Sequence, residues 1–168
     1  YITIATTGNA SDFGDLASAD KLVANKGGLA SPTRAIFAGG NSPFSKLIDY
    51  VQIATKGDSK DFGDLTHTHD ETAGSSSPTR GIFAGGNPGT DTIEYLTIAT
   101  LGNAIDFGNL TSSTRALAAT SSSTRSVIGG GYTNAIVNHI DYITISSTGN
   151  AATFGDLTVV KRDIGAVS

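Results

Sequence analysis

The fold of this chain is decided by residues 77–110, which read SPTRGIFAGGNPGTDTIEYLTIATLGNAIDFGNL. The run at residues 81–84 ends at two glycines, which is typical of a short β-strand buried on both faces. The same prediction applies to the equivalent runs at residues 35–38 and 126–128. Residues 95–99 then alternate, with Leu96 and Ile98 on one face and Tyr, Thr and Ala on the other. This alternation predicts a second strand.

Two further strands are expected in the same period. The third is Asp-Phe-Gly-Asn-Leu at residues 106–110, reached through a Gly-Asn-Ala turn at residues 102–104. Gly-Asn and Gly-Asp pairs supply the positive-φ residues that tight hairpin turns need. A weaker fourth strand is expected at residues 22–24, 116–119 and 164–167.

These blocks recur along the chain. The tyrosine block begins at Tyr1, Tyr50, Tyr95 and Tyr142, with spacings of 49, 45 and 47 residues. The Arg–apolar–Gly-Gly block recurs at residues 31–40, 77–86 and 122–131. We therefore expect residues 1–168 to form one all-β repeat array of about 3.5 periods. Four short antiparallel strands per period are typical of a β-propeller blade.

Composition excludes several classes of protein. The chain has 168 residues, a net charge of −4, and no Cys, Met or Trp. No cluster of Lys and Arg is present to neutralise phosphates, so we expect no nucleic-acid partner. No apolar run has the roughly 18 residues of a membrane span, so we expect no membrane insertion. Since the chain lacks Met and starts inside the repeat pattern, we expect it to be a piece of a longer polypeptide.

The repeat resembles the Kelch repeat. The matching residues are Arg80, Ile82, Phe83, Gly85, Gly86, Tyr95, Phe107, Leu110 and Arg115. It departs from that family because Kelch repeats usually carry Trp, closer to the tyrosine, where Phe107 stands. The sequence pattern TIATxGNAxDFGDLT…SSPTRGIFAGG is similar to tandem repeats of virion structural and tail-fibre-like proteins of tailed phages, especially cyanophages. This resemblance implies a Kelch-like β-propeller located in a virion.

The repeated positions favour structural roles over catalytic ones. Asp-Phe-Gly copies the magnesium motif of protein kinases, but the companion kinase motifs are missing. We expect its phenylalanines to pack between blades and its glycines to permit a bend. The framework positions are Arg34, Arg80, Arg125, Gly40, Gly86, Gly131, Phe13, Phe62, Phe107 and Phe154. No catalytic set is recognised, so we expect no enzyme, no cofactor and no bound metal.

The three arginines allow two interpretations. They could form a ring of cations for an anionic ligand, or each guanidinium could bond loop carbonyls or an acidic residue before the repeat tyrosine. Those acidic residues are Asp49, Glu94 and Asp141. We favour the structural interpretation.

Two sets of residues have side chains of the types that bind metals. The pairs Asp12/Asp15 and Asp61/Asp64 could suggest calcium, but repeats three and four lose one acid each, which favours turn hydrogen bonding. The run His67-Thr-His-Asp-Glu could suggest zinc if it formed a strand. Because it occurs in one repeat alone, a solvated edge is the favoured interpretation.

The leading functional hypothesis is a non-enzymatic structural or binding module of a virion appendage such as a tail fibre. Its partners would be further copies, other virion proteins, or host-surface polysaccharide. Sugar contact would need exposed aromatics, for which Phe44 and Tyr132 in loops are the candidates. The alternatives are a repetitive extracellular bacterial adhesin or filament subunit at the cell surface, or a Kelch-type protein-interaction module.

Overall fold

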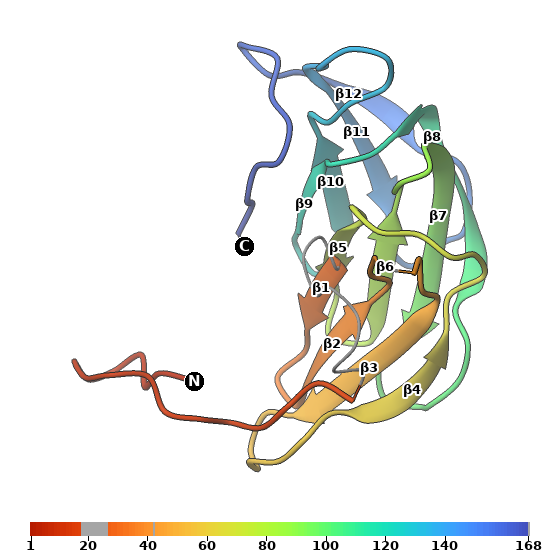
Figure 1. The fold of residues 1–168 in the computed structure, drawn as a ribbon. Coiled ribbons are helices and arrows are strands. Elements are labelled where there is room, and N and C mark those ends of the chain that lie inside the picture. The colour runs from red at the N-terminus through yellow and green to blue at the C-terminus, as the bar shows by residue number, and fades with distance from the viewer. Residues whose placement is uncertain (18–26, 42, 168) are drawn as a thin grey trace.

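The computed structural model describes residues 1–17, 27–41 and 43–167. This part of the chain is all-β, with three four-stranded antiparallel sheets and no helix (Figure 1). The first sheet contains β1 (Gly27–Ala30), β2 (Arg34–Ala38), β3 (Leu47–Gln52) and β4 (Lys60–Asp64). The second contains β5 (Ala73–Ser76), β6 (Arg80–Ala84), β7 (Thr90–Thr97) and β8 (Ile105–Thr114). The third contains β9 (Ala118–Ser121), β10 (Arg125–Gly129), β11 (His139–Thr144) and β12 (Ala152–Asp156). Within the described residues, no helix is long and apolar enough to cross a membrane.

Each sheet is an antiparallel meander, and equivalent residues are paired in all three sheets. The repeat tyrosine pairs with an apolar residue of the preceding strand, as in Ile36 opposite Tyr50 and Ile82 opposite Tyr95. In β4 a β-bulge places an extra residue, Phe62, between the residues that pair with Ile48 and Asp49. The bulge bends this strand, as bulges do, and it recurs in the other two sheets.

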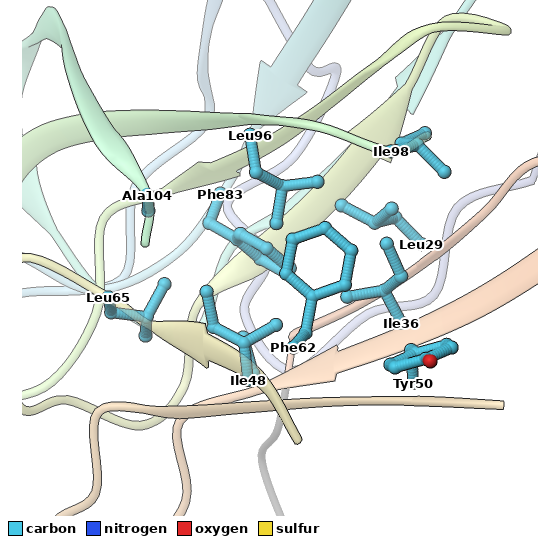
Figure 2. Close-up of a cluster of buried hydrophobic side chains, with 11 residues drawn as sticks. Leu29, Ile36, Ile48, Tyr50, Phe62, Leu65, Phe83, Leu96, Ile98 and Ala104 are labelled. Carbon is cyan, nitrogen blue, oxygen red and sulfur yellow. The ribbon is translucent and has the colours of Figure 1, made fainter. Parts of the chain in front are cut away.

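Two apolar cores lie between consecutive sheets rather than within one. The first core joins β2, β3 and β4 to Phe83, Leu96 and Ile98 of the second sheet (Figure 2). The second core joins the second sheet to Ile128, Ile143 and Ile145 of the third. Each sheet therefore depends on its neighbours for burial, as expected of repeat units that cannot bury their apolar faces alone.

The middle strands are not equally buried. In β6 Gly81, Ile82, Phe83 and Ala84 are all buried, as predicted for a strand covered on both faces. In β2 and β10 buried residues alternate with partly exposed ones, so the same prediction is wrong for these two strands. The second sheet lies between two neighbours, whereas the first and third each have a complete sheet on one side only.

The first strands of the three sheets, β1, β5 and β9, lie next to one another, and we call them the inner strands. They correct the prediction of a weaker fourth strand in each period. The β9 strand starts two residues later than predicted, and residues 164–167 form no strand. The prediction at residues 22–24 lies outside the described residues. A Cβ on Gly74 would lie under 3.0 Å from the backbone of Gly28. These strands are consequently built from small residues, without the β-branched signal that sequence reasoning looks for.

The predicted Gly-Asn turn is also corrected. The hairpin between β3 and β4 turns at residues 52–55, where the Thr55 N–H donates to the Gln52 carbonyl at 3.2 Å. Gly57, with φ 145°, follows this turn and faces the preceding repeat. Gly57 therefore contributes its N–H to a contact between repeats and lies outside the turn.

The N-terminal block forms no strand, although strands were expected there. It keeps the hairpin register of the other repeats, because Tyr1 and Ser11 exchange backbone hydrogen bonds of 2.7 and 2.9 Å. The rings of Tyr1 and Phe13 meet edge to face with centroids 6.1 Å apart. Residues 1–17 thus carry the outer hairpin of a further repeat, without its inner strands.

Candidate functional site

One end of the sheets collects the loops that differ between repeats. We call it the loop face; it comprises the β2–β3, β6–β7 and β10–β11 loops, the β4–β5 and β8–β9 connectors, and residues 157–163. The second glycine of each Gly-Gly pair anchors a loop to the next connector. The bonds are Gly40 N–H to His69 O at 3.2 Å, Gly86 N–H to Thr114 O at 3.0 Å, and Gly131 N–H to Lys161 O at 2.7 Å. The three glycines have φ between 108° and 139°, which residues with side chains rarely adopt.

The two aromatic candidates lie on this face in different surroundings. Phe44 is 41% exposed in the β2–β3 loop. Tyr132 is partly buried, and the guanidinium carbons of Arg115 and Arg162 lie 4.9 and 5.5 Å from its ring centroid. Arg115 also pairs with Glu71 at 3.2 Å. The Tyr132 ring is thus already in contact with cations, which leaves Phe44 as the more accessible ring.

The His67-to-Glu71 run is not the solvated edge that the sequence suggested. His67 is exposed and bonds Thr66 Oγ1 through Nδ1 at 2.8 Å, whereas His69 is 3% exposed. His69 Nε2 lies 3.1 Å from Glu94 Oε1, which is itself 1% exposed. Asp70 is fully buried as well. The run forms a connector between sheets, in which His69 and Asp70 are buried and His67 is exposed.

The fold changes the acidity of Glu94. Burial alone would raise the pKa of Glu94, but the nearby His69 imidazole and the hydrogen bond from the Thr66 N–H outweigh burial. The pKa of Glu94 therefore lies below its ordinary value. In the third sheet Asp141 takes the corresponding place and accepts bonds from Thr111.

No metal-binding group is assembled in residues 1–17, 27–41 and 43–167: no three His, Cys, Asp or Glu side chains gather there. Asp64, of the pair Asp61/Asp64 that could suggest calcium, instead contacts Lys46 at 3.0 Å. Asp61 accepts a hydrogen bond from the Gly63 N–H at 3.1 Å, which is turn hydrogen bonding. These acids are used in structural contacts.

The repeated arginines join one sheet to the next. Arg34 Nη1 donates to the Ile98 carbonyl at 2.6 Å, and Arg80 Nη1 donates to the Ile145 carbonyl at 2.8 Å. Each guanidinium also lies over its repeat tyrosine, at 4.9 and 4.3 Å. Arg125 lies 4.6 Å from the ring centroid of its tyrosine but is exposed.

The repeated phenylalanines follow the same pattern. Phe62 and Phe107 are each 3% exposed and lie between consecutive sheets. Phe13 is partly exposed, and Phe154 is 55% exposed. All four rings meet their repeat tyrosine edge to face.

A concavity lies among β1, β5 and β9, the first strands of the three sheets. Its volume is about 210 Å³, and it is lined by β1, β5 and β9 together with Ala166 and Val167. The lining residues are small, and none is titratable. It offers backbone groups and hydroxyls, with no acid, base or nucleophile pair for catalysis. Comparisons of the chain with protein-family models and with curated proteins found no match.

Proposed function

We propose that the chain is a non-enzymatic structural and binding module of a virion appendage, such as a tail fibre of a tailed phage. In this proposal the three sheets are blades of a Kelch-like β-propeller. Adjacent inner strands, outward-running meanders and cores between consecutive sheets all support the blade interpretation. The sequence resemblance supports the virion setting.

The observation that carries the binding role is the distribution of non-repeated residues. The Arg, Phe and Gly-Gly positions that recur are used to join sheets, whereas Phe44, Tyr132 and the His67-to-Glu71 run gather on the loop face. A loop end carried by a rigid β-framework is where binding residues concentrate in many folds. The loop face would contact host-surface polysaccharide, with Phe44 stacking on a sugar ring.

Binding to an array of bacterial surface polysaccharides tests the recognition role. Wild-type protein is expected to be retained on at least one polysaccharide, and Phe44→Ala is expected to weaken retention about tenfold through loss of the stacking surface. Leu101→Ala is the matched control, because Leu101 is 56% exposed on a hairpin at the opposite end of the sheets. Retention that is absent, or equal in both variants, would contradict glycan binding by this face. Labelling of phage particles by an antibody against the chain tests the virion setting.

A further inference from the structure

Consecutive sheets are joined by one small contact that recurs along the chain. The carbonyls of Phe62 and Asp64 accept hydrogen bonds from the N–H groups of Gly102 and Ala104, at 2.9 and 2.8 Å. The Asp64 N–H donates to Asn103 Oδ1 at 3.0 Å. We call residues 62–64 and their equivalents the Phe-Gly edge, and residues 102–104 and their equivalents the Gly-Asn hairpin.

The contact is made three times. It joins the edge at residues 13–15 to the hairpin at 57–59, the edge at 62–64 to the hairpin at 102–104, and the edge at 107–109 to the hairpin at 149–151. A Cβ on the middle glycine of each edge would lie under 3.0 Å from the backbone of the hairpin; these glycines are Gly14, Gly63 and Gly108. The missing side chain is therefore a requirement of the contact.

The fourth Phe-Gly edge, at residues 154–156, is open. Phe154 is 55% exposed, whereas Phe62 and Phe107 at the covered edges are 3% exposed. Nothing lies within 4 Å of a Cβ placed on Gly155, although its φ of 156° matches that of the other edge glycines. The adjoining Arg125 is exposed as well. In the described chain, this edge has the components of the contact without its partner.

The complementary surface lies at residues 1–17. The Gly-Asn hairpin at residues 8–10 is exposed. Ile4 is 97% exposed, whereas the equivalent Ile98 and Ile145, whose carbonyls receive the arginines, are 2% and 1% exposed. The open edge and the open hairpin are thus the two halves of an interface that the chain itself forms three times.

We propose that the Phe-Gly edge at residues 154–156 docks the Gly-Asn hairpin at residues 8–10 of a second copy of this chain. In this interface the Phe154 and Asp156 carbonyls accept from the N–H groups of Gly8 and Ala10, and the Asp156 N–H donates to the Asn9 amide oxygen. Arg125 reaches the carbonyl of the second copy's Ile4. The inference deepens the proposed structural module and rests on it.

We assign the docked hairpin to a second copy, since the matching hairpin within the described residues is anchored elsewhere. Residues 13–17 are held on the first sheet by the Gly57 and Ser59 N–H groups, at 2.9 and 2.8 Å, while the edge at residues 154–156 stays uncovered. The two surfaces differ from one another, so the contact is head to tail. Repeating such a contact gives rows of copies, or a ring where the rotation closes.

Sedimentation velocity over a range of concentrations tests the docking. Wild-type protein is expected to form dimers and larger species as its concentration rises. Gly155→Ala is expected to weaken this association at least tenfold, because its Cβ would collide with the incoming hairpin. Gly89→Ala, another glycine with nothing within 4 Å of an added Cβ, is the control and should associate like wild type. A wild-type chain that stays monomeric, or equal association of Gly155→Ala, would overturn the proposal.

Cysteine pairing identifies the occupant, since the natural chain has no cysteine. A chain carrying both Ala10→Cys and Asp156→Cys is expected to give a ladder of covalently linked copies on mild oxidation. Disulfide-linked monomers would show that the chain's own hairpin covers the edge, and absence of any linkage would refute the contact; either result overturns the proposal. Polysaccharide retention by Gly155→Ala is measured in parallel. Gly155 lies in β12 of the third sheet, whereas Phe44 lies in the β2–β3 loop of the first sheet. Loss of association with retained binding therefore separates failure of the two proposals.

Discussion

Gly108 and Gly155 offer a matched pair of substitutions that isolates the contact between sheets. Their φ angles are 148° and 156°, so alanine meets similar backbone strain, about 1–3 kcal/mol, at both positions. A Cβ on Gly108 would also lie under 3.0 Å from the backbone of Gly149, whereas one on Gly155 meets nothing within 4 Å. The contact is therefore disrupted in Gly108→Ala alone.

The magnitude follows from the bonds at that contact. Separating the edge from the hairpin removes two backbone bonds of 2.8 Å and the bond from the Asn109 N–H to Asn150 Oδ1 at 3.1 Å. At about 1 kcal/mol each, Gly108→Ala should destabilise the chain by about 2–3 kcal/mol more than Gly155→Ala. For a chain of this size, that corresponds to a difference in Tm of roughly 4–12 °C.

Urea and thermal unfolding of both variants, in protein dilute enough to be monomeric, measure this difference. If the two variants lose the same free energy of unfolding within about 0.5 kcal/mol, the contact does not hold consecutive sheets together. The same conclusion follows if Gly155→Ala is the less stable variant.

Three further predictions concern other contacts between sheets. Arg80→Ala should lower the free energy of unfolding by about 2–3 kcal/mol in urea titrations, because it removes a charged bond to a carbonyl and a cation–π contact. Phe107→Ala should lower it by about 3–5 kcal/mol in the same assay, because it leaves a cavity in the second core. The pKa of Glu94 is lower in the folded chain than in the unfolded chain, so its contribution is present above pH 4.5 and is lost as the pH falls through the folded-state pKa. The stability difference between wild type and Glu94→Gln, measured by thermal unfolding from pH 7 to 3, should shrink over that range.

Equivalent residues at the open edge supply the controls. Arg125→Ala should lose about 0.5–1 kcal/mol, since its guanidinium contacts a tyrosine ring without the carbonyl bond. Phe154→Ala should lose well under half of the Phe107 effect, because the ring is 55% exposed. Losses equal to those at Arg80 and Phe107 would contradict the assigned contacts. A Glu94→Gln difference that stays constant with pH would contradict the assigned His69–Glu94 pair.

The sequence predicted the two middle strands of each sheet well. Alternating residues around Tyr95 and the apolar run at residues 82–84 carry ordinary strand signals, and β6 and β7 lie there. The inner strands were harder to predict because β5 reads Ala-Gly-Ser-Ser, a composition set by the close approach of neighbouring sheets. β-Propensity describes the preference of residues in an isolated strand, whereas these strands form by packing against the strands of neighbouring sheets.

The candidate site shows the same division. The repeat pattern marked Arg34 and Arg80, but their carbonyl partners lie 64 and 65 residues away and had no sequence signal. The burial of His69 and its pairing with Glu94 depend on the packing of neighbouring sheets. The polar sequence of residues 67–71 could therefore not indicate either of them. The same holds for the contacts of Tyr132 with two arginines.

Residue-resolved amide hydrogen exchange tests most directly that consecutive sheets are joined through the Phe-Gly edge. In dilute protein, the N–H groups of Gly102 and Ala104 are expected to be protected, because they donate to the preceding edge. The N–H groups of Gly8 and Ala10 occupy the same repeat positions without a partner edge and should exchange at the rates of an unprotected chain. Equal, fast exchange at all four positions would contradict the account.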